Sequence, residues 1–311
     1  MHNHAHHHDH NHSHAAYQGS MNTRAFIVAI LLNATFVVIE FLYGYWSHSL
    51  ALMADAGHNL GDVAGLAISL LAFQMAAKSP NAKYTFGYSK GTILASLANA
   101  ILLLLAVGSI GYEAVQRLFK PENPQWQTIS LVAAIGIVIN TLTALLFMKR
   151  NELNNRAAFL HMAADAGVSA AVVLGGFLIE LTHFAQIDSI ISLLICGVII
   201  VGSWGLLKSS MRLSLDGVPQ NIDTNKIREA ALAVPGVRDI HHLHIWAMST
   251  TRNALTAHLL IEDGMSYEAV HQLKKDLKHA WLHLNIQHAT IETETEHHDD
   301  CEDCHTAGSF D

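Results

Sequence analysis

Residues 187–207 read IDSIISLLICGVIIVGSWGLL, a run in which Asp188 is the only charged side chain. A helix of about 20 apolar residues is long enough to cross the hydrocarbon core of a bilayer. Five other segments have the same character, so the apolar segments are residues 25–46, 50–77, 92–116, 128–149, 156–181 and 187–207. The sequence therefore predicts a membrane-embedded, all-α six-helix bundle over residues 24–210.

The composition agrees with a membrane protein. Hydrophobic residues make up 51% of the 311 residues and charged residues only 14%, whereas a soluble domain carries about 25% charged residues. The net charge of −8 provides no basic surface of the kind that nucleic-acid binding needs. The chain does not begin with a basic segment followed by an apolar one, so we expect no cleavable signal peptide.

The distribution of Lys and Arg over the loops predicts the orientation. Nine of these residues lie on one side, and only Arg117 and Lys120 lie on the other. Because positively charged loops stay in the cytosol, both termini should be cytosolic, which also fits an even number of spans. We expect an integral, multi-pass protein of a bacterial inner membrane.

The pattern changes to that of a soluble domain from about residue 215. Helical periodicity covers residues 222–234 and 266–284, with Ser266 as an N-cap, and strand-like patterns cover 237–248, 254–261 and 287–294. The order αββαβ predicts a cytosolic α+β domain of the ferredoxin-like class over residues 215–296. Residues 1–23 should be a disordered His-rich segment, and residues 297–311 a polar tail that contains a CxxC.

Two HxxxD motifs lie inside the apolar segments. His58 and Asp62 belong to the second segment, and His161 and Asp165 belong to the fifth. Residues four apart share one face of a helix, and two imidazoles with two carboxylates form a tetrahedral set that suits Zn²⁺. Ionisable groups inside a bilayer are costly and usually mark an ion pathway. The segment boundaries place the two motifs roughly 10 Å apart in depth, so a shared site would need helix tilt or a protruding fifth helix.

At these residues the chain resembles the cation diffusion facilitator family, in its zinc-exporting branch. The resemblance extends over residues 24–304 and rests on the run from Ser49 to Asp62, on Thr85-Phe-Gly-Tyr, on His161 to Asp165, and on His241-His-Leu-His-Ile-Trp246. It implies a homodimer with a metallochaperone-like cytosolic domain that exchanges Zn²⁺ for protons, and it implies that the four HxxxD residues form the transport site. Unlike some members, this chain has no Asp or His between Lys78 and Lys90, so we expect no metal site there.

Other acidic groups lie in the apolar segments. Glu40 and Asp188 resemble family positions and could serve ion or proton access, and Asp55 could orient His58. The structural alternative for Glu40 and Asp188 is that they are helix-interface groups, hydrogen-bonded to Asn33, Asn99 or Asn140, and for Asp55 it is capping or packing.

The cytosolic domain carries a second group of candidate ligands. His241, His258 and Glu294 should lie on neighbouring strands, with Cys301 and Cys304 just beyond. Imidazole and thiolate suit zinc, and the resemblance implies a structural or regulatory zinc ion at these positions. The candidates of lower rank are His242, His244 and His271, whereas His279, His283, His288, His297, His298 and His305 are expected to be ordinary surface histidines. The run from His2 to His14 would collect metal loosely, unless it is an engineered tag.

These observations favour a secondary transporter for divalent metals that uses the lipid bilayer, metal ions and protons as its partners. An intramembrane zinc hydrolase would need a general base, commonly in HExxH, and the chain contains no HExxH. A non-transporting metal sensor would not need intramembrane ligands. The ligand types leave Zn²⁺, Cd²⁺, Co²⁺ and Ni²⁺ open as the main substrate.

Overall fold

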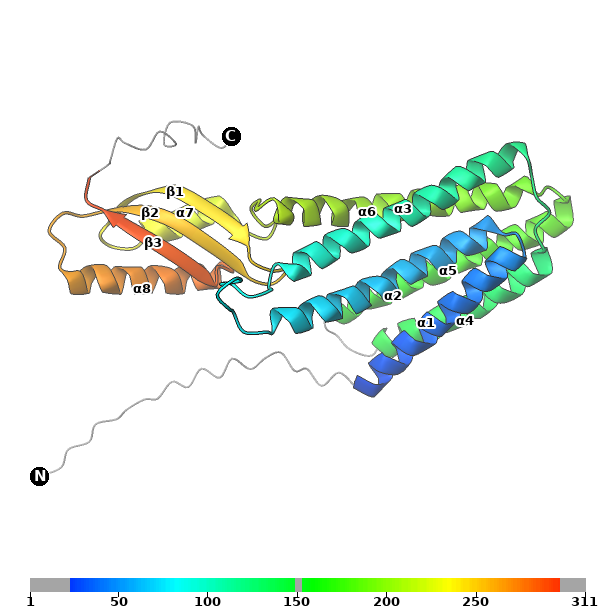
Figure 1. Ribbon diagram of the computed structural model, residues 1–311, viewed down its shortest axis with the longest axis horizontal. Coiled ribbons are helices and arrows are strands. Elements are labelled where there is room, and N and C mark those ends of the chain that lie inside the picture. Colours follow the sequence, from blue (N-terminus) through cyan, green and yellow to red (C-terminus); the bar gives the residue numbers. More distant parts are fainter. Residues whose placement is uncertain (1–22, 149–152, 297–311) are drawn as a thin grey trace, which may run out of the picture.

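The computed structural model describes residues 23–148 and 153–296, so residues 1–22, the CxxC at Cys301 and Cys304, and the rest of 297–311 lie outside the described part. Six long helices form one end of an elongated molecule, and a small sheet with two shorter helices forms the other (Figure 1). The N- to C-terminal order of these parts agrees with the sequence analysis.

Each predicted apolar segment corresponds to one helix. The helices are α1 (Thr23–Trp46), α2 (Leu50–Ala76), α3 (Gly91–Phe119), α4 (Trp126–Met148), α5 (Leu153–Thr182) and α6 (Gln186–Ser214). Within the described residues, three stretches are long and apolar enough to cross a bilayer, namely α3, residues 164–182 of α5, and α6. Residues 31–46 and 126–142 form shorter apolar helices. Lipid offers no hydrogen-bond partners to the backbone, but a helix pairs its own backbone groups and can therefore cross a bilayer. The chain is thus an integral membrane protein.

The sixth apolar segment ends near residue 207, whereas α6 continues to Ser214. The added turns carry Lys208 and Arg212, so the apolar pattern ends while the helix continues. Hydropathy marks the limit of the bilayer core and not the end of a helix. This extension brings α6 up to the small domain.

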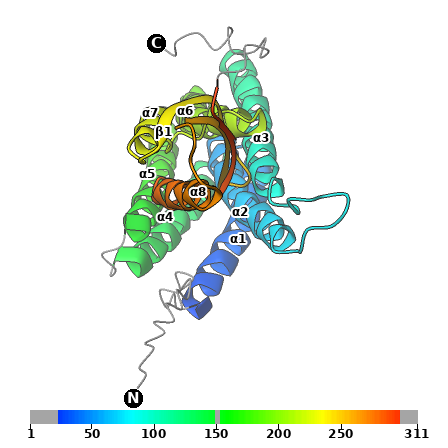
Figure 2. The same ribbon diagram turned by 90° about the vertical axis from the view of Figure 1, so that its left-hand side faces the viewer.

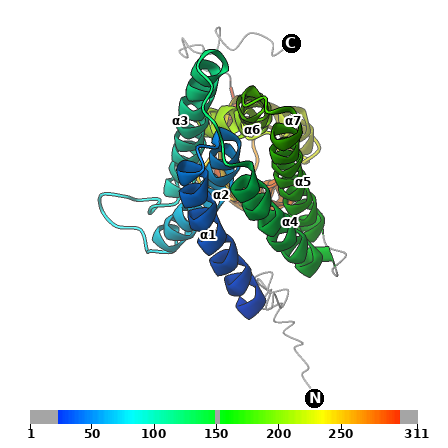
Figure 3. The ribbon, with the colours of Figure 1, turned by 90° about the vertical axis from the view of Figure 1, so that its right-hand side faces the viewer.

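Helix α2 occupies the middle of the helical region, where it contacts α1, α3, α5 and α6. Figure 3, viewed from the end opposite the sheet, shows the other helices around it. The buried core between the helices is apolar and includes Phe36, Leu52, Val107, Ile129, Val172 and Ile199. Polar residues of α2 that point into this region therefore lie among several helices at once.

The small domain has the predicted element order. It consists of α7 (Thr224–Leu232), β1 (Val237–Ala247), β2 (Asn253–Ile261), α8 (Tyr267–His283) and β3 (His288–Glu294). The sheet order is β1-β2-β3, in which β1 and β2 are antiparallel and β2 and β3 are parallel. Helices α7 and α8 contact each other and share one core with the sheet. The indole of Trp281 is fully buried there and donates to the Ile227 carbonyl at 3.0 Å.

Local signals explain where these elements begin and end. Ser266 accepts a hydrogen bond from the Ala269 amide at 3.2 Å, so the predicted N-cap of α8 is confirmed. Asp223 caps α7 in the same way. Gly236 joins α7 to β1 at φ 92°, a backbone conformation that glycine adopts without steric cost. Viewed from its own side, the domain lies beside the cyan ends of α2 and α3 (Figure 2).

Three contacts join the small domain and its linker to the helices. Lys90 Nζ lies 2.6 Å from Asp216 Oδ1 in the linker. The Thr250 amide donates to Thr92 Oγ1 at 3.1 Å. The ring of His288 lies edge-on to Phe86, with 5.6 Å between the ring centroids. These contacts place the start of β3 beside the loop between α2 and α3.

Candidate metal centres

The two HxxxD helices meet inside the helical region. Nε2 of His58 on α2 lies 3.3 Å from Oδ1 of Asp165 on α5, and the Asp165 side chain is 3% exposed. For tetrahedral Zn²⁺ with bonds of about 2.0–2.2 Å, a nitrogen and an oxygen ligand are about 3.4 Å apart. The separation of these two atoms is therefore that of two ligands on one ion.

The register of α2 and α5 places the second residue of each motif. Ser169 Oγ donates to Asp55 Oδ2 at 2.8 Å, and His58 contacts Asp165. From the first contact to the second, the position on α2 advances by three residues and the position on α5 goes back by four. The helices are thus antiparallel, and one further turn brings Asp62 level with His161. Nothing is described of the side chains of Asp62 and His161.

The sequence suggested that the two motifs lie at different depths, and a displacement of α2 and α5 along their axes removes this difference. His58 lies eight residues after the start of α2, whereas Asp165 lies 17 residues before the end of α5. At about 1.5 Å per residue these are roughly 12 Å and 26 Å of helix. The two helices are therefore displaced along their axes, and this displacement brings the motifs to one level.

A second polar cluster lies beside His58. Glu40 and Asp55 are fully buried, and the Asn59 amide nitrogen lies 3.4 Å from an oxygen of each carboxyl group. Asn59, which the sequence analysis did not single out, is therefore an amide partner of both carboxyl groups. Asp55 is held by Ser169 and Asn59. An access role for Glu40 and an orienting role for Asp55 stay predictions.

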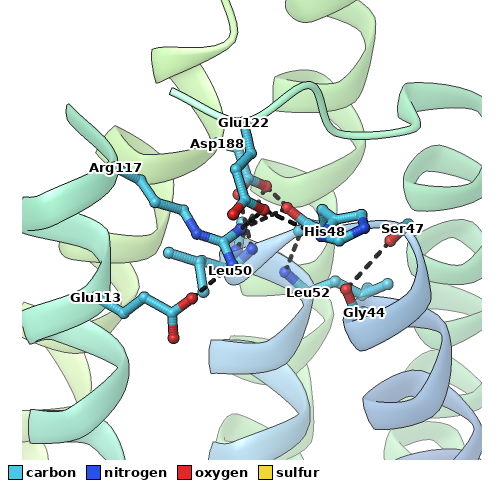
Figure 4. A network of polar contacts seen from close by, with 11 residues as sticks. Gly44, Ser47, His48, Leu50, Leu52, Glu113, Arg117, Glu122 and Asp188 are labelled. Carbon is cyan, nitrogen blue, oxygen red and sulfur yellow. Dashed lines mark hydrogen bonds and ion pairs between the residues drawn. The ribbon is translucent and has the colours of Figure 1, made fainter. Parts of the chain in front are cut away.

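Asp188 caps the start of α2. Its carboxylate accepts from Ser49 Oγ at 2.5 Å and from the Leu50 amide at 2.7 Å (Figure 4). The first amides of a helix have no partner within the helix, and a carboxylate there also faces the positive end of the helix dipole. These contacts give Asp188 a structural role, and its predicted role in ion access is untested.

The neighbouring loops continue this polar network. Arg117 donates to the His48 carbonyl at 2.8 Å, and His48 Nδ1 lies 3.0 Å from Glu122 Oε2. His48 has φ 57°, so this turn places a non-glycine residue in the left-handed region. The network fastens the turn between α1 and α2 to α3 and to the loop that follows it.

Three predicted ligands of the small domain meet on the face of the sheet opposite to its helices. His241 pairs with His258 across β1 and β2, and Glu294 lies on the adjoining strand. Glu294 accepts from His258 Nδ1 at 2.6 Å and lies 3.1 Å from His241 Nε2. One potential ligand atom from each of the three lies within 4.8 Å of the other two. This group could hold a metal ion, with the CxxC positions outside the described residues.

The histidines also affect Glu294. Burial disfavours its charged form, but the hydrogen bond from His258 and the charges of His241 and His258 outweigh burial and lower the pKa of Glu294. A carboxylate that stays ionised is ready to coordinate a cation.

A β-bulge brings a further histidine to this group. The register shifts between His241 and His244, and His242 has φ 47°. As a result the rings of His242 and His258 lie 5.0 Å apart, closer than the 5.6 Å between those of His241 and His258. The sequence analysis ranked His242 below His241 and His258, and a bulge of this kind is not visible in a strand pattern. His244 and His271 are not brought into the His241, His258 and Glu294 group.

Together, the membrane helices and the two clusters of nitrogen and oxygen ligands define a membrane protein that handles metal ions. Comparison with known families makes this specific. Residues 26–213 match the cation efflux transmembrane domain, and residues 219–296 match the cation efflux protein, cytoplasmic domain. The chain belongs to the cation efflux family, the cation diffusion facilitators.

Relatives from bacteria match over almost the whole chain. The cadmium, cobalt and zinc/H⁺-K⁺ antiporter of Bacillus subtilis is 31% identical over 281 residues, which cover 89% of this chain and 90% of that protein. The zinc transporter ZitB of Yersinia pestis is 36% identical, with 89% of each chain covered. The metal cation efflux system protein CzcD of Cupriavidus metallidurans is 35% identical, with 88% and 87% covered.

Proposed function

We propose that this protein is a secondary active transporter that exports Zn²⁺ from the cytosol in exchange for protons. His58, Asp62, His161 and Asp165 would hold the ion during its passage. The observation that carries the proposal is the 3.3 Å contact between His58 and Asp165, which joins the two motif-bearing helices among buried side chains. The names of the relatives support both zinc as the substrate and protons as the exchanged ion.

Exchange with protons follows from the chemistry of these ligands. Imidazole must be neutral and carboxylates ionised to bind a metal, so protons and metal compete for the same atoms. A free imidazole titrates near pH 6.5, so this competition falls in the physiological range. Ion binding from one side and release by protons on the other is then sufficient for antiport by alternating access.

The finer architecture belongs to the same proposal. Six spans with both termini cytosolic in a bacterial inner membrane fit the loop charges, and a homodimer fits the family of the cytoplasmic domain. The αββαβ order with both helices in one core supports a ferredoxin-like domain. Zinc at His241, His258 and Glu294 would be structural or regulatory. The ligand types also admit Cd²⁺, Co²⁺ and Ni²⁺.

Flux into proteoliposomes with an imposed pH gradient tests the proposal. Asp165→Asn keeps the size of the side chain but removes the charge that offsets a buried dication, so Zn²⁺ flux should fall by at least ~100-fold, about 2.7 kcal/mol. The matched control is Asp216→Asn, which changes an exposed carboxylate in the linker and should keep flux within about twofold. Parental flux in Asp165→Asn would refute the site, and proton-independent flux would refute the antiport.

A further inference from the structure

Two exposed histidines on α8 point the same ring nitrogens at each other. Nε2 of His279 and Nε2 of His283 are 3.4 Å apart, and the two rings are perpendicular, with 4.8 Å between their centroids. The residues are four apart, so they lie one turn from each other on one face of the helix. Neither residue is among the candidate ligands described above.

The distance between these nitrogens is that of two ligands on one metal ion. With zinc–nitrogen bonds of about 2.0–2.1 Å, tetrahedral coordination sets the two nitrogens about 3.3–3.4 Å apart. Without a metal, one neutral imidazole can donate its Nε2 proton to the other at this distance. A metal cation that replaces this proton would find both Nε2 atoms already facing each other at the separation of two ligands.

Packing gives no other reason for the pair. Both side chains are exposed, whereas the buried face of α8 is formed by Leu273, Leu277 and Trp281. A single histidine at a helix C-terminus is favourable because of the helix dipole, which accounts for His283 alone. It does not account for the pairing of the two Nε2 atoms.

The surroundings admit a cation. The pair occupies the last two turns of α8, where the helix dipole presents partial negative charge. Lys275 is one turn earlier on the same face but is exposed, so water and salt screen its charge. Asp276 is held by Gln272 at 2.7 Å and leaves the two imidazoles as the ligands.

We propose that His279 and His283 form a second cytosolic metal site, which holds a borderline divalent ion such as Zn²⁺, Cu²⁺ or Ni²⁺ through two imidazole nitrogens. Two protein ligands leave coordination positions to water, so the ion exchanges readily, in contrast to a closed four-ligand site. Imidazole selects these ions over Mg²⁺ and Ca²⁺. The site does not depend on the transport proposal.

The place of the pair in the fold suggests its use. The end of α8 that carries it faces the transmembrane helices (Figure 1). Asn285, two residues further on, lines a polar cavity of about 200 Å³ together with Ser209 and Leu213 of α6. An ion bound by the pair would therefore lie near the junction between the small domain and the helices.

Histidine footprinting by carbethoxylation, with peptide mass spectrometry of the full-length protein, tests the site residue by residue. Zn²⁺ should slow the modification of His279 and His283 at least ~5-fold and with one shared midpoint. In His283→Ala the zinc midpoint for His279 should rise at least ~10-fold, because the second ligand no longer acts at high effective concentration. Protection of His258 should be unchanged in this variant, which shows that the domain is folded.

A shifted pair provides the decisive control. Lys275→His together with His283→Ala rebuilds the four-residue spacing one turn earlier, and it should restore protection of His279, with the imidazole introduced in place of Lys275 as the new partner. Zinc flux at saturating metal should stay parental in all these variants, so failure of the site leaves the transport proposal standing. Equal protection of His279 with and without His283, or no protection at zinc concentrations well above those that protect His258, overturns the chelate.

Discussion

Replacing Asp188 with Asn should loosen the attachment of α2 to α6 and lower stability without removing the transport site. The carboxylate at the start of α6 is 4% exposed and accepts two short hydrogen bonds at the start of α2, from Ser49, which precedes the helix, and from Leu50, its first residue. Asn keeps one acceptor oxygen and presents an NH₂ group in place of the other. One amide or hydroxyl donor is then left buried without its acceptor.

The magnitude follows from these contacts. A hydrogen bond to a charged group contributes about 1.5–3 kcal/mol, and the carboxylate charge at the helix N-terminus adds about 0.3–1 kcal/mol. The expected loss is therefore about 2–4 kcal/mol. For a domain of 150–250 residues this corresponds to a midpoint lowered by roughly 4–16 °C.

Thermal unfolding should be measured in detergent. Zinc flux should be measured below the unfolding midpoint after the same purified protein has been reconstituted into proteoliposomes. Glu113→Gln is the matched control, because this carboxylate on α3 is 48% exposed and pairs with Arg117, so its loss should cost about 0–1 kcal/mol. Asp188→Asn should unfold earlier and transport normally while folded. An unchanged midpoint together with lost flux would refute the capping role and assign Asp188 to the ion path.

Three other predictions concern the small domain and its junction. Lys90→Glu should break the contact with Asp216 and make the linker after α6 more sensitive to limited proteolysis, although an exposed pair of this kind contributes only about 0–1 kcal/mol. The double variant Lys90→Glu with Asp216→Lys should restore resistance. No recovery in the double variant would exclude the ion pair as the cause. Because the pKa of Glu294 is lowered in the folded state, its contribution to stability is present above the ordinary Glu pKa near 4.3 and is lost as pH falls through the lowered value. Metal-free protein unfolded between pH 7 and pH 3 should therefore lose more stability than its Glu294→Gln variant, and parallel pH profiles would contradict this. Trp281→Phe should cost about 0.5–1.5 kcal/mol, since it removes the indole donor from the Ile227 carbonyl, which keeps its helical partner within α7, and an unchanged midpoint in denaturant unfolding would show that the indole hydrogen bond does not stabilise the domain.

The elements could be predicted from the sequence because each rests on a local pattern. Apolar length predicts membrane helices, and Ser266 before an amphipathic run predicts the start of α8. The strand pattern also brought His241, His258 and Glu294 onto neighbouring strands, since side chains two apart share a face of a sheet.

The remaining features depend on how distant elements meet, which no local pattern contains. The contact between His58 and Asp165 requires the axial displacement of α2 and α5, and the capping of α2 by Asp188 requires the short turn between α5 and α6. Asn59 reads as an ordinary helix residue until α1 and α2 are placed side by side. The position of His242 depends on a β-bulge, which inserts one residue into a strand and reverses the faces of those that follow.

The antiparallel register of α2 and α5 makes the proposed transport site sensitive to sliding in steps. In each motif the His and the Asp are four residues apart, which is about 6 Å along the axis of a helix. In the present alignment His58 lies opposite Asp165, and the register of the two helices brings Asp62 level with His161. If one helix moved past the other by one full turn, only one residue of each motif would still lie opposite a residue of the other motif. Small displacements of one helix along the other would thus weaken binding of the ion, and a displacement of one helical turn would abolish it.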